Sequence, residues 1–147
     1  MKITSKTRKA ICLTVFVTYI LIVLKLTIFR FDIHYYERQI NLSLFTDLVN
    51  IYKNVGIKIF LRLFLGNIGW FVPFGFLLPM LLKKNSLFKI MLIGFIFSFS
   101  IEILQFVFRK GVAELDDLIL NILGTAIGYF MYKLICKITS LRKKQQT

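Results

Sequence analysis

The chain has 147 residues, of which 57% are hydrophobic and only 18% charged, and its mean hydropathy is +0.73. A soluble domain of average composition carries roughly 25% charged residues, and a soluble chain this short cannot bury so much apolar surface in one core. These values exclude a soluble globular enzyme and predict an integral membrane protein. The net charge of +13 would favour nucleic-acid binding in a soluble protein. In a membrane protein such an excess sets the topology, so no nucleic-acid partner is expected.

Four apolar runs follow one another along the chain, at residues 10–29, 64–82, 87–108 and 118–136. Each is long enough for a helix across the hydrocarbon core, which takes about 20 residues. A signal peptide is the alternative for the first run, but the run is longer than a usual signal core and lacks a small-residue cleavage site. We therefore predict an all-α fold, a four-helix transmembrane bundle that forms one domain over residues 1–147.

The basic residues are distributed unevenly about these spans. Twelve of the 20 lysines and arginines lie in the N-terminal tail, around the turn between spans two and three, and at the C-terminal end. All seven acidic residues fall on the opposite side or in the half of the bundle nearest to it. Basic residues concentrate on the cytoplasmic side, so the sequence predicts a multi-pass protein of the cell membrane with both termini in the cytoplasm.

The segment 30–63 is then expected outside the membrane. Its apolar residues recur at roughly helical spacing, with lysines between them; they are Leu48, Ile51, Tyr52, Val55 and Ile59. The pattern is typical of a short amphipathic helix that lies among the lipid headgroups. Packing of the same residues on top of the bundle explains the pattern equally well, and both interpretations stay open.

The residue types that most often carry site chemistry are few. Cys12 and Cys136 lack C-x-x-C spacing, which argues against a disulfide framework, and they supply too few ligands for a thiolate metal site. His34 stands alone beside two tyrosines, and the chain has no H-E-x-x-H motif and no glycine-rich phosphate loop. No catalytic residue, metal or cofactor is predicted from these residues.

Polar residues gather in the outer half of spans three and four. Glu102 lies roughly 9 Å below the end of its span, at 1.5 Å per residue, and Gln105 and Arg109 follow on the same helical face. Span four carries Asp117 and Asn121 on one stripe with two glycines, Gly124 and Gly128, whose spacing predicts close helix contact. We expect Arg109 to pair with Asp117 or Glu102, because pairing lowers the cost of burying charge.

Span two begins near Asn67 and contains Pro73 and Pro79, which free backbone carbonyls inside the helix. A kink there would open a pocket beside Asn67. Six polar residues are thus expected at one depth: Asn67, Glu102, Gln105, Arg109, Asp117 and Asn121. They fit a hydrogen-bond network that sets helix register, a site for a polar headgroup, proton or ion, or a catalytic site in which carboxylates act as acid and base.

Several of these motifs, taken in order, resemble the VanZ-like family of small bacterial membrane proteins. The resemblance rests on Asn67, on FVPFGFLLP at 71–79, on SIEILQ at 100–105 with Arg109 after it, and on DDLILNILGTAIGY at 116–129. The family also has an NLxPF-like element in its outer segment. Here that element reads NLSLF at 41–45, with Leu44 where the family has proline.

The resemblance implies a role in susceptibility to glycopeptide antibiotics, teicoplanin in particular, to which the founding member is linked. Glycopeptides and lipid-linked wall precursors meet at the outer leaflet, which is where the polar cluster is predicted. We therefore expect a non-enzymatic protein that recognises an envelope lipid, a lipid-linked wall precursor or a lipoglycopeptide. In this hypothesis Arg109 contacts phosphate or carboxylate, Glu102 and Asp117 orient Arg109 or bind a cation, and the three amides donate hydrogen bonds. The alternatives are an intramembrane enzyme with Glu102 or Asp117 as acid or base, and a structural subunit of an envelope complex.

Overall fold

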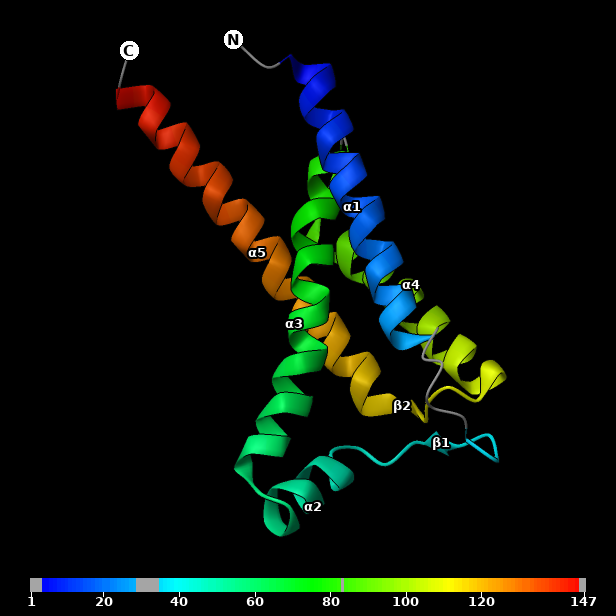
Figure 1. Ribbon diagram of the computed structural model, residues 1–147. Coiled ribbons are helices and arrows are strands. Elements are labelled where there is room, and N and C mark those ends of the chain that lie inside the picture. The colour runs from blue at the N-terminus through cyan, green and yellow to red at the C-terminus, as the bar shows by residue number, and fades with distance from the viewer. Residues whose placement is uncertain (1–3, 29–34, 83, 146–147) are drawn as a thin grey trace.

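The computed structural model describes residues 4–28, 35–82 and 84–145 of the chain (Figure 1). His34, the lone histidine of the sequence, lies outside the described residues. Arg30, Asp32 and Lys83 lie outside them as well. The elements in chain order are α1 (Ser5–Thr27), β1 (Ile40–Asn41), α2 (Thr46–Asn54), α3 (Ile57–Leu81), α4 (Leu87–Phe108), β2 (Ala113–Glu114) and α5 (Leu115–Gln145).

The predicted all-α fold is confirmed: α1, α3, α4 and α5 are each long and apolar enough to cross a membrane. The bounds of α4 are those predicted, because Ser86 caps its start by accepting the Lys89 N–H (3.3 Å) and Arg109 ends it in a left-handed conformation (φ 55°). Helix α3 begins at Ile57 rather than at residue 64, directly after Gly56 (φ 115°). Helix α5 extends beyond the apolar run at both ends, since hydropathy marks the membrane span and not the end of the helix.

Helix α3 continues through both prolines. Carbonyls beside them accept hydrogen bonds from side chains: Tyr19 donates to the Trp70 carbonyl (2.5 Å), and Asn85 donates to the Pro79 carbonyl (3.1 Å). The carbonyls that the two prolines leave without a helical donor are those four residues earlier, at Gly69 and Gly75, so these side-chain bonds add to the helix near the prolines and do not replace the lost ones.

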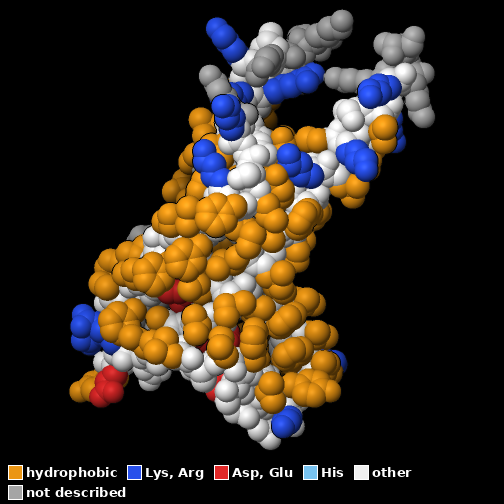
Figure 2. Space-filling model, turned by 180° about the vertical axis from the view of Figure 1, so that it is seen from behind, with side chains coloured by type: hydrophobic (Ala, Val, Ile, Leu, Met, Phe, Trp, Pro, Cys, Tyr) orange, Lys and Arg blue, Asp and Glu red, His pale blue; other side chains and the backbone are white. Residues whose placement is uncertain are grey.

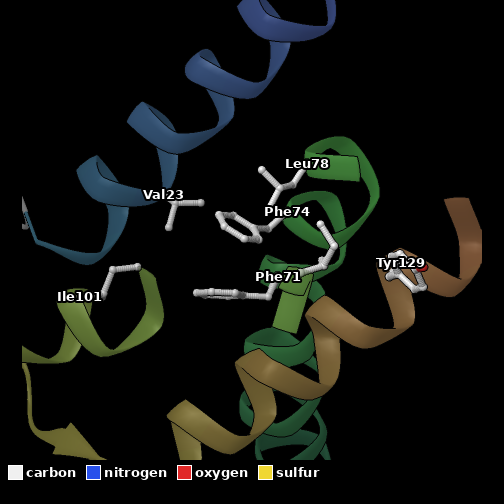
Figure 3. Packing of buried hydrophobic residues seen from close by; sticks show 7 residues of the cluster. Val23, Phe71, Phe74, Leu78, Ile101 and Tyr129 are labelled. Carbon is white, nitrogen blue, oxygen red and sulfur yellow. The ribbon is translucent and has the colours of Figure 1, made fainter. Parts of the chain in front are cut away.

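The core lies where α1 and α4 meet α3 (Figure 3). Val23 from α1 and Ile101 from α4 point toward Phe71 and Phe74 of α3, and all four side chains are buried. Phe74 also stacks on Phe97 with ring centroids 5.1 Å apart. Large apolar residues elsewhere are exposed, and on the face shown in Figure 2 they form a broad belt, which is the surface that a bilayer would cover.

Helices α3 and α5 cross closely and make the most extensive contact between any two elements of the described chain. A Cβ on Gly124 would overlap the Ile68 carbonyl oxygen, and one on Gly128 would overlap the Val72 carbonyl oxygen. Gly75 of α3 faces the backbone of Thr125 in the same way. The close approach predicted for the two glycines of the last span is therefore confirmed, and the partner helix is α3.

The strand end, defined as the end of the bundle with β1, β2 and α2, carries residues 35–56 of the segment between α1 and α3. Strand β1 pairs in parallel with β2, with Ile40 opposite Ala113 and Asn41 opposite Glu114. The Phe45 N–H, at a left-handed residue (φ 53°), donates to both carboxylate oxygens of the buried Asp116 (2.8 and 3.0 Å). These contacts hold the segment against the start of α5.

The apolar residues of this segment do not form one continuous amphipathic helix. Gly56 separates α2 from α3, and Ile59 belongs to α3. Leu48 is buried, Ile51 is half-buried, and Tyr52 and Val55 are exposed. Two of the five residues thus pack on the bundle and three are exposed, so neither interpretation accounts for all five.

Both ends of the described chain lie at the end of the bundle opposite the strand end (Figure 1). On the face shown in Figure 2, lysines and arginines gather at this terminal end, above the apolar belt. The acidic side chains visible on that face lie in the other half of the molecule. The charge separation expected from the sequence is therefore present in the fold.

Candidate functional site

A cavity of about 1000 Å³ opens at the strand end, between the four long helices and α2. Its lining combines carboxylates, amides and apolar side chains. The lining residues are Val23, Lys25, Leu26, Thr27, Asp47, Leu48, Asn50, Ile51, Leu63, Asn67, Trp70, Phe71, Ile101, Glu102, Gln105, Glu114, Asp117 and Asn121. A pocket beside Asn67 was predicted, and the structure confirms it.

The structure brings five of the six predicted site residues together in this cavity: Asn67, Glu102, Gln105, Asp117 and Asn121. They come from α3, α4 and α5, so three helices contribute to one polar wall. Two of the five, Glu102 and Asn121, are each only 7% exposed. The helical periodicity of spans three and four was sufficient to place these side chains toward a common centre.

Arg109 is the predicted residue that does not line the cavity. Its guanidinium donates to the Tyr36 carbonyl (3.3 Å), and among the described residues it forms no ion pair with Glu102 or Asp117, so the predicted pairing is wrong. The reason is its backbone: Arg109 ends α4 with φ 55°, outside the helical conformation. The spacing rule that places residues three and seven apart on one face applies only within the helix.

Glu102 is held by the turn that follows α4. One of its carboxylate oxygens, Oε2, accepts the backbone N–H of Glu114 (3.0 Å). Gln105, one turn later, donates to the Thr27 carbonyl at the end of α1 (3.4 Å). These two bonds fix the polar face of α4 against β2 and α1.

The polar residues of α5 are also held by neighbouring helices. Asn67 of α3 donates to the Asp117 carboxylate, and Asn121 donates to Ser98 of α4 (2.9 Å). Thr125 donates to the Asn121 carbonyl (2.9 Å) and, like Ser98, is fully buried. The part of the cavity wall formed by α5 is therefore a hydrogen-bonded network, as the helix-register interpretation also required.

Sequence reasoning missed two acidic residues of the lining, Asp47 and Glu114. Asn41 of the NLSLF element donates to Asp47 (2.5 Å) and accepts from the N–H and hydroxyl of Ser43 (3.0 and 2.6 Å), so this element orders the loop before α2. Partial burial raises the pKa of Glu114, and the neighbouring charges of Asp47 and Asp116 raise it further. Asp47 stands two residues after the NLSLF element, and no local sequence pattern indicated that it would line the cavity.

The chemical character of the cavity is acidic. Four carboxylates line it, from Asp47, Glu102, Glu114 and Asp117, against the single lysine of the lining, Lys25. Within the described ranges, no group of three or more histidine, cysteine, aspartate or glutamate side chains is arranged to hold a metal ion. The arrangement is suited to binding a polar group by charge and hydrogen bonding.

These features define a multi-pass, α-helical membrane protein whose bundle encloses a polar cavity at one end. The chain belongs to the VanZ/LLP1 family, whose model matches residues 16–136, a range that includes every lining residue of the cavity. It is 29% identical over 110 residues to Protein VanZ of Enterococcus faecium. The match covers 75% of this chain and 62% of that relative, so the chain spans less than two thirds of the relative's length. No solved structure matches the chain.

Proposed function

We propose that the protein recognises the polar head of an amphiphilic envelope molecule at the outer leaflet and thereby lowers susceptibility to teicoplanin-type glycopeptides. The amphiphile is an envelope lipid, a lipid-linked wall precursor or a lipoglycopeptide. The cavity carries this proposal, because its lining combines buried polar side chains with apolar side chains that are exposed at the surface. Glu102 and Asn121 are each 7% exposed, whereas Leu26, Leu63 and Trp70 are 41–46% exposed. Such a site suits a molecule with a polar head and a lipid-embedded tail.

The proposal places the strand end outside the cell and both termini in the cytoplasm. It is supported by the gathering of lysines and arginines at the terminal end, because short cytoplasmic segments of membrane proteins are enriched in these residues.

Reporter fusions test this orientation. Fusions at Lys84 and at Thr147 are expected to give cytoplasmic signals, and a fusion after Asn50, in α2, an external one. Enzymatic reporters active on only one side of the membrane make the measurement. An external signal from the Thr147 fusion would overturn the orientation and with it the placement of the cavity at the outer leaflet.

A cavity-filling variant tests the recognition function. Leu63→Trp enlarges a side chain of the lining, whereas Leu65→Trp makes the same change at a more exposed position of α3 outside the lining. We expect Leu63→Trp to lose co-purified amphiphile, measured by native mass spectrometry, and to restore teicoplanin susceptibility, while melting within a few degrees of wild type. Leu65→Trp is expected to keep both properties. Unchanged amphiphile content and susceptibility in a folded Leu63→Trp variant would exclude recognition in this cavity.

Asp117→Asn separates recognition from catalysis and from a purely structural role. The change keeps the shape and the acceptor for Asn67 but removes the charge and the capacity for proton transfer. Recognition predicts that a folded variant loses bound amphiphile and phenotype together. Catalysis predicts that the amphiphile stays bound while the phenotype disappears, and a register network predicts a large fall in melting temperature.

A further inference from the structure

The charges around the cavity are unbalanced. Asp47, Glu102, Glu114 and Asp117 line it together with one lysine, Lys25. Among the described residues, no ion pair joins Lys25 to any of the four carboxylates. Arg109, the cation that the sequence assigned to this cluster, instead contacts the Tyr36 carbonyl. The cavity therefore has an acidic lining that neither of these two cations neutralises.

Glu102 provides a second, independent observation. The residue is more than nine-tenths buried, and its Oε2 accepts the Glu114 N–H. The other oxygen, Oε1, has no hydrogen-bond partner among the described residues. No fully buried side-chain oxygen or nitrogen of the described chain lacks a partner, so Oε1 is accessible. Glu102 lines this cavity and also a smaller, mostly apolar one, and of the two only the larger adds the carboxylates of Asp47 and Asp117. Burying a carboxylate without a counter-ion is costly, and a cation in the cavity would offset that cost.

The cavity fits an organic cation better than a metal ion. Calcium takes six to eight oxygen ligands within roughly 2.6 Å, and the acidic residues of the described chain do not converge in that way. A volume of about 1000 Å³ accommodates a whole headgroup. An ammonium group offers three hydrogen-bond donors, which suits a wall of carboxylate and amide oxygens. An anionic group would meet four carboxylates in the lining and only Lys25 as a cationic partner.

From this combination of an accessible carboxylate oxygen without a hydrogen-bond partner, on the largely buried Glu102, and an acidic lining in one large cavity, we infer that the protein selects amphiphiles whose polar head carries an amine. The ammonium group lies against Glu102 and Asp117, and Lys25 is placed to meet a phosphate or carboxylate of the same head. The inference rests on the proposed function and names the ligand chemistry of that site. An amino-phospholipid and a glycopeptide with a free amine share this chemistry.

Binding of matched amphiphiles to the full chain in phosphatidylglycerol nanodiscs tests the inference. The probes are phosphatidylethanolamine and teicoplanin, each compared with its N-acetylated form, in which the amine is neutral. We expect acetylation to weaken binding at least about tenfold for the source that the protein uses, which corresponds to about 1.4 kcal/mol. N,N-dimethyl-phosphatidylethanolamine adds bulk but keeps the charge, and when the lipid is the source it is expected to bind nearly as well as the parent lipid.

Two carboxamide variants assign the preference to the cavity. Glu102→Gln keeps an oxygen for the Glu114 N–H but removes the charge, and it is expected to bind the amine and acetylated forms about equally. Asp47→Asn makes the same change at an exposed residue of α2, so it reports on the acidic lining even when Glu102→Gln does not fold. It is expected to weaken amine binding in the same direction.

The failures of the two proposals are distinguishable. Equal binding of amine and acetylated probes to wild type, with Leu63→Trp abolishing both, overturns the amine preference and leaves headgroup recognition standing. Tighter binding of the acetylated, more anionic lipid overturns it in favour of recognition through Lys25. Absence of binding by every probe overturns the amine inference, and with an unchanged Leu63→Trp phenotype it overturns the proposed function as well.

Discussion

Gly124→Leu and Gly128→Leu are expected to give little or no folded protein. A Cβ at either position would overlap a backbone carbonyl oxygen of α3, and at Gly128 it would also lie 2.8 Å from the Phe76 nitrogen. Backbone atoms cannot move aside as a flexible side chain does, so α3 and α5 would have to separate. Overpacking costs typically 1–3 kcal/mol. We expect a cost at or above the upper end of that range here, because this helix pair makes the most extensive contact in the fold.

Gly66→Ala and Gly69→Ala are the matched controls. Both glycines lie in α3, and a Cβ at either position meets nothing within 4 Å. These variants are expected to express and melt like wild type or slightly above it, since alanine favours helix over glycine by roughly 1 kcal/mol. Folded yield after size-exclusion chromatography and thermal unfolding in detergent make the comparison. Gly124→Leu and Gly128→Leu variants that accumulate and resist heat as the controls do would contradict the close crossing.

Asp116→Ala is expected to release residues 35–56 from the strand end. The Asp116 side chain is 2% exposed and accepts the Phe45 N–H with both carboxylate oxygens. Its removal leaves that N–H without its acceptor. A hydrogen bond to a charged group contributes about 1.5–3 kcal/mol to the free energy of unfolding, so we expect a loss of that size. We therefore expect a lower melting temperature than that of wild type, together with faster tryptic cleavage after Lys53 or Lys58.

Two further variants test the assignment of this effect to Asp116. Glu37→Ala removes an exposed acid from the same segment and is expected to leave both melting and proteolysis unchanged. Asp116→Asn keeps one oxygen acceptor and is expected to give an intermediate result. An Asp116→Ala variant that matched Glu37→Ala in both measurements would show that the pairing of β1 with β2 is sufficient to hold the segment.

Much of the fold was predictable because it depends on local sequence properties. The number of spans follows from the length of each apolar run relative to the bilayer, and the structure has four such helices. The helical repeat placed Glu102 and Gln105 on one face of α4, and Asp117 and Asn121 on one face of α5. The glycine stripe of α5 was equally predictable, since close packing in a membrane favours small residues at helical spacing. For these residues the periodicity of one helix was enough to indicate which side chains share a wall.

The tertiary structure decided two kinds of feature. One is the contacts between residues far apart in the chain, and the other is the placement of residues at helix ends. The parallel pairing of β1 with β2, whose partners are 73 positions apart, brings Asp47 into the cavity beside Glu114, and no local pattern specifies it. Arg109 lies outside the cavity because of its own backbone conformation. Its left-handed conformation ends α4, so its side chain no longer follows the helical repeat. The acidic character of the cavity thus follows from two long-range or helix-terminal features, whereas its position at one end of the bundle follows from the sequence alone.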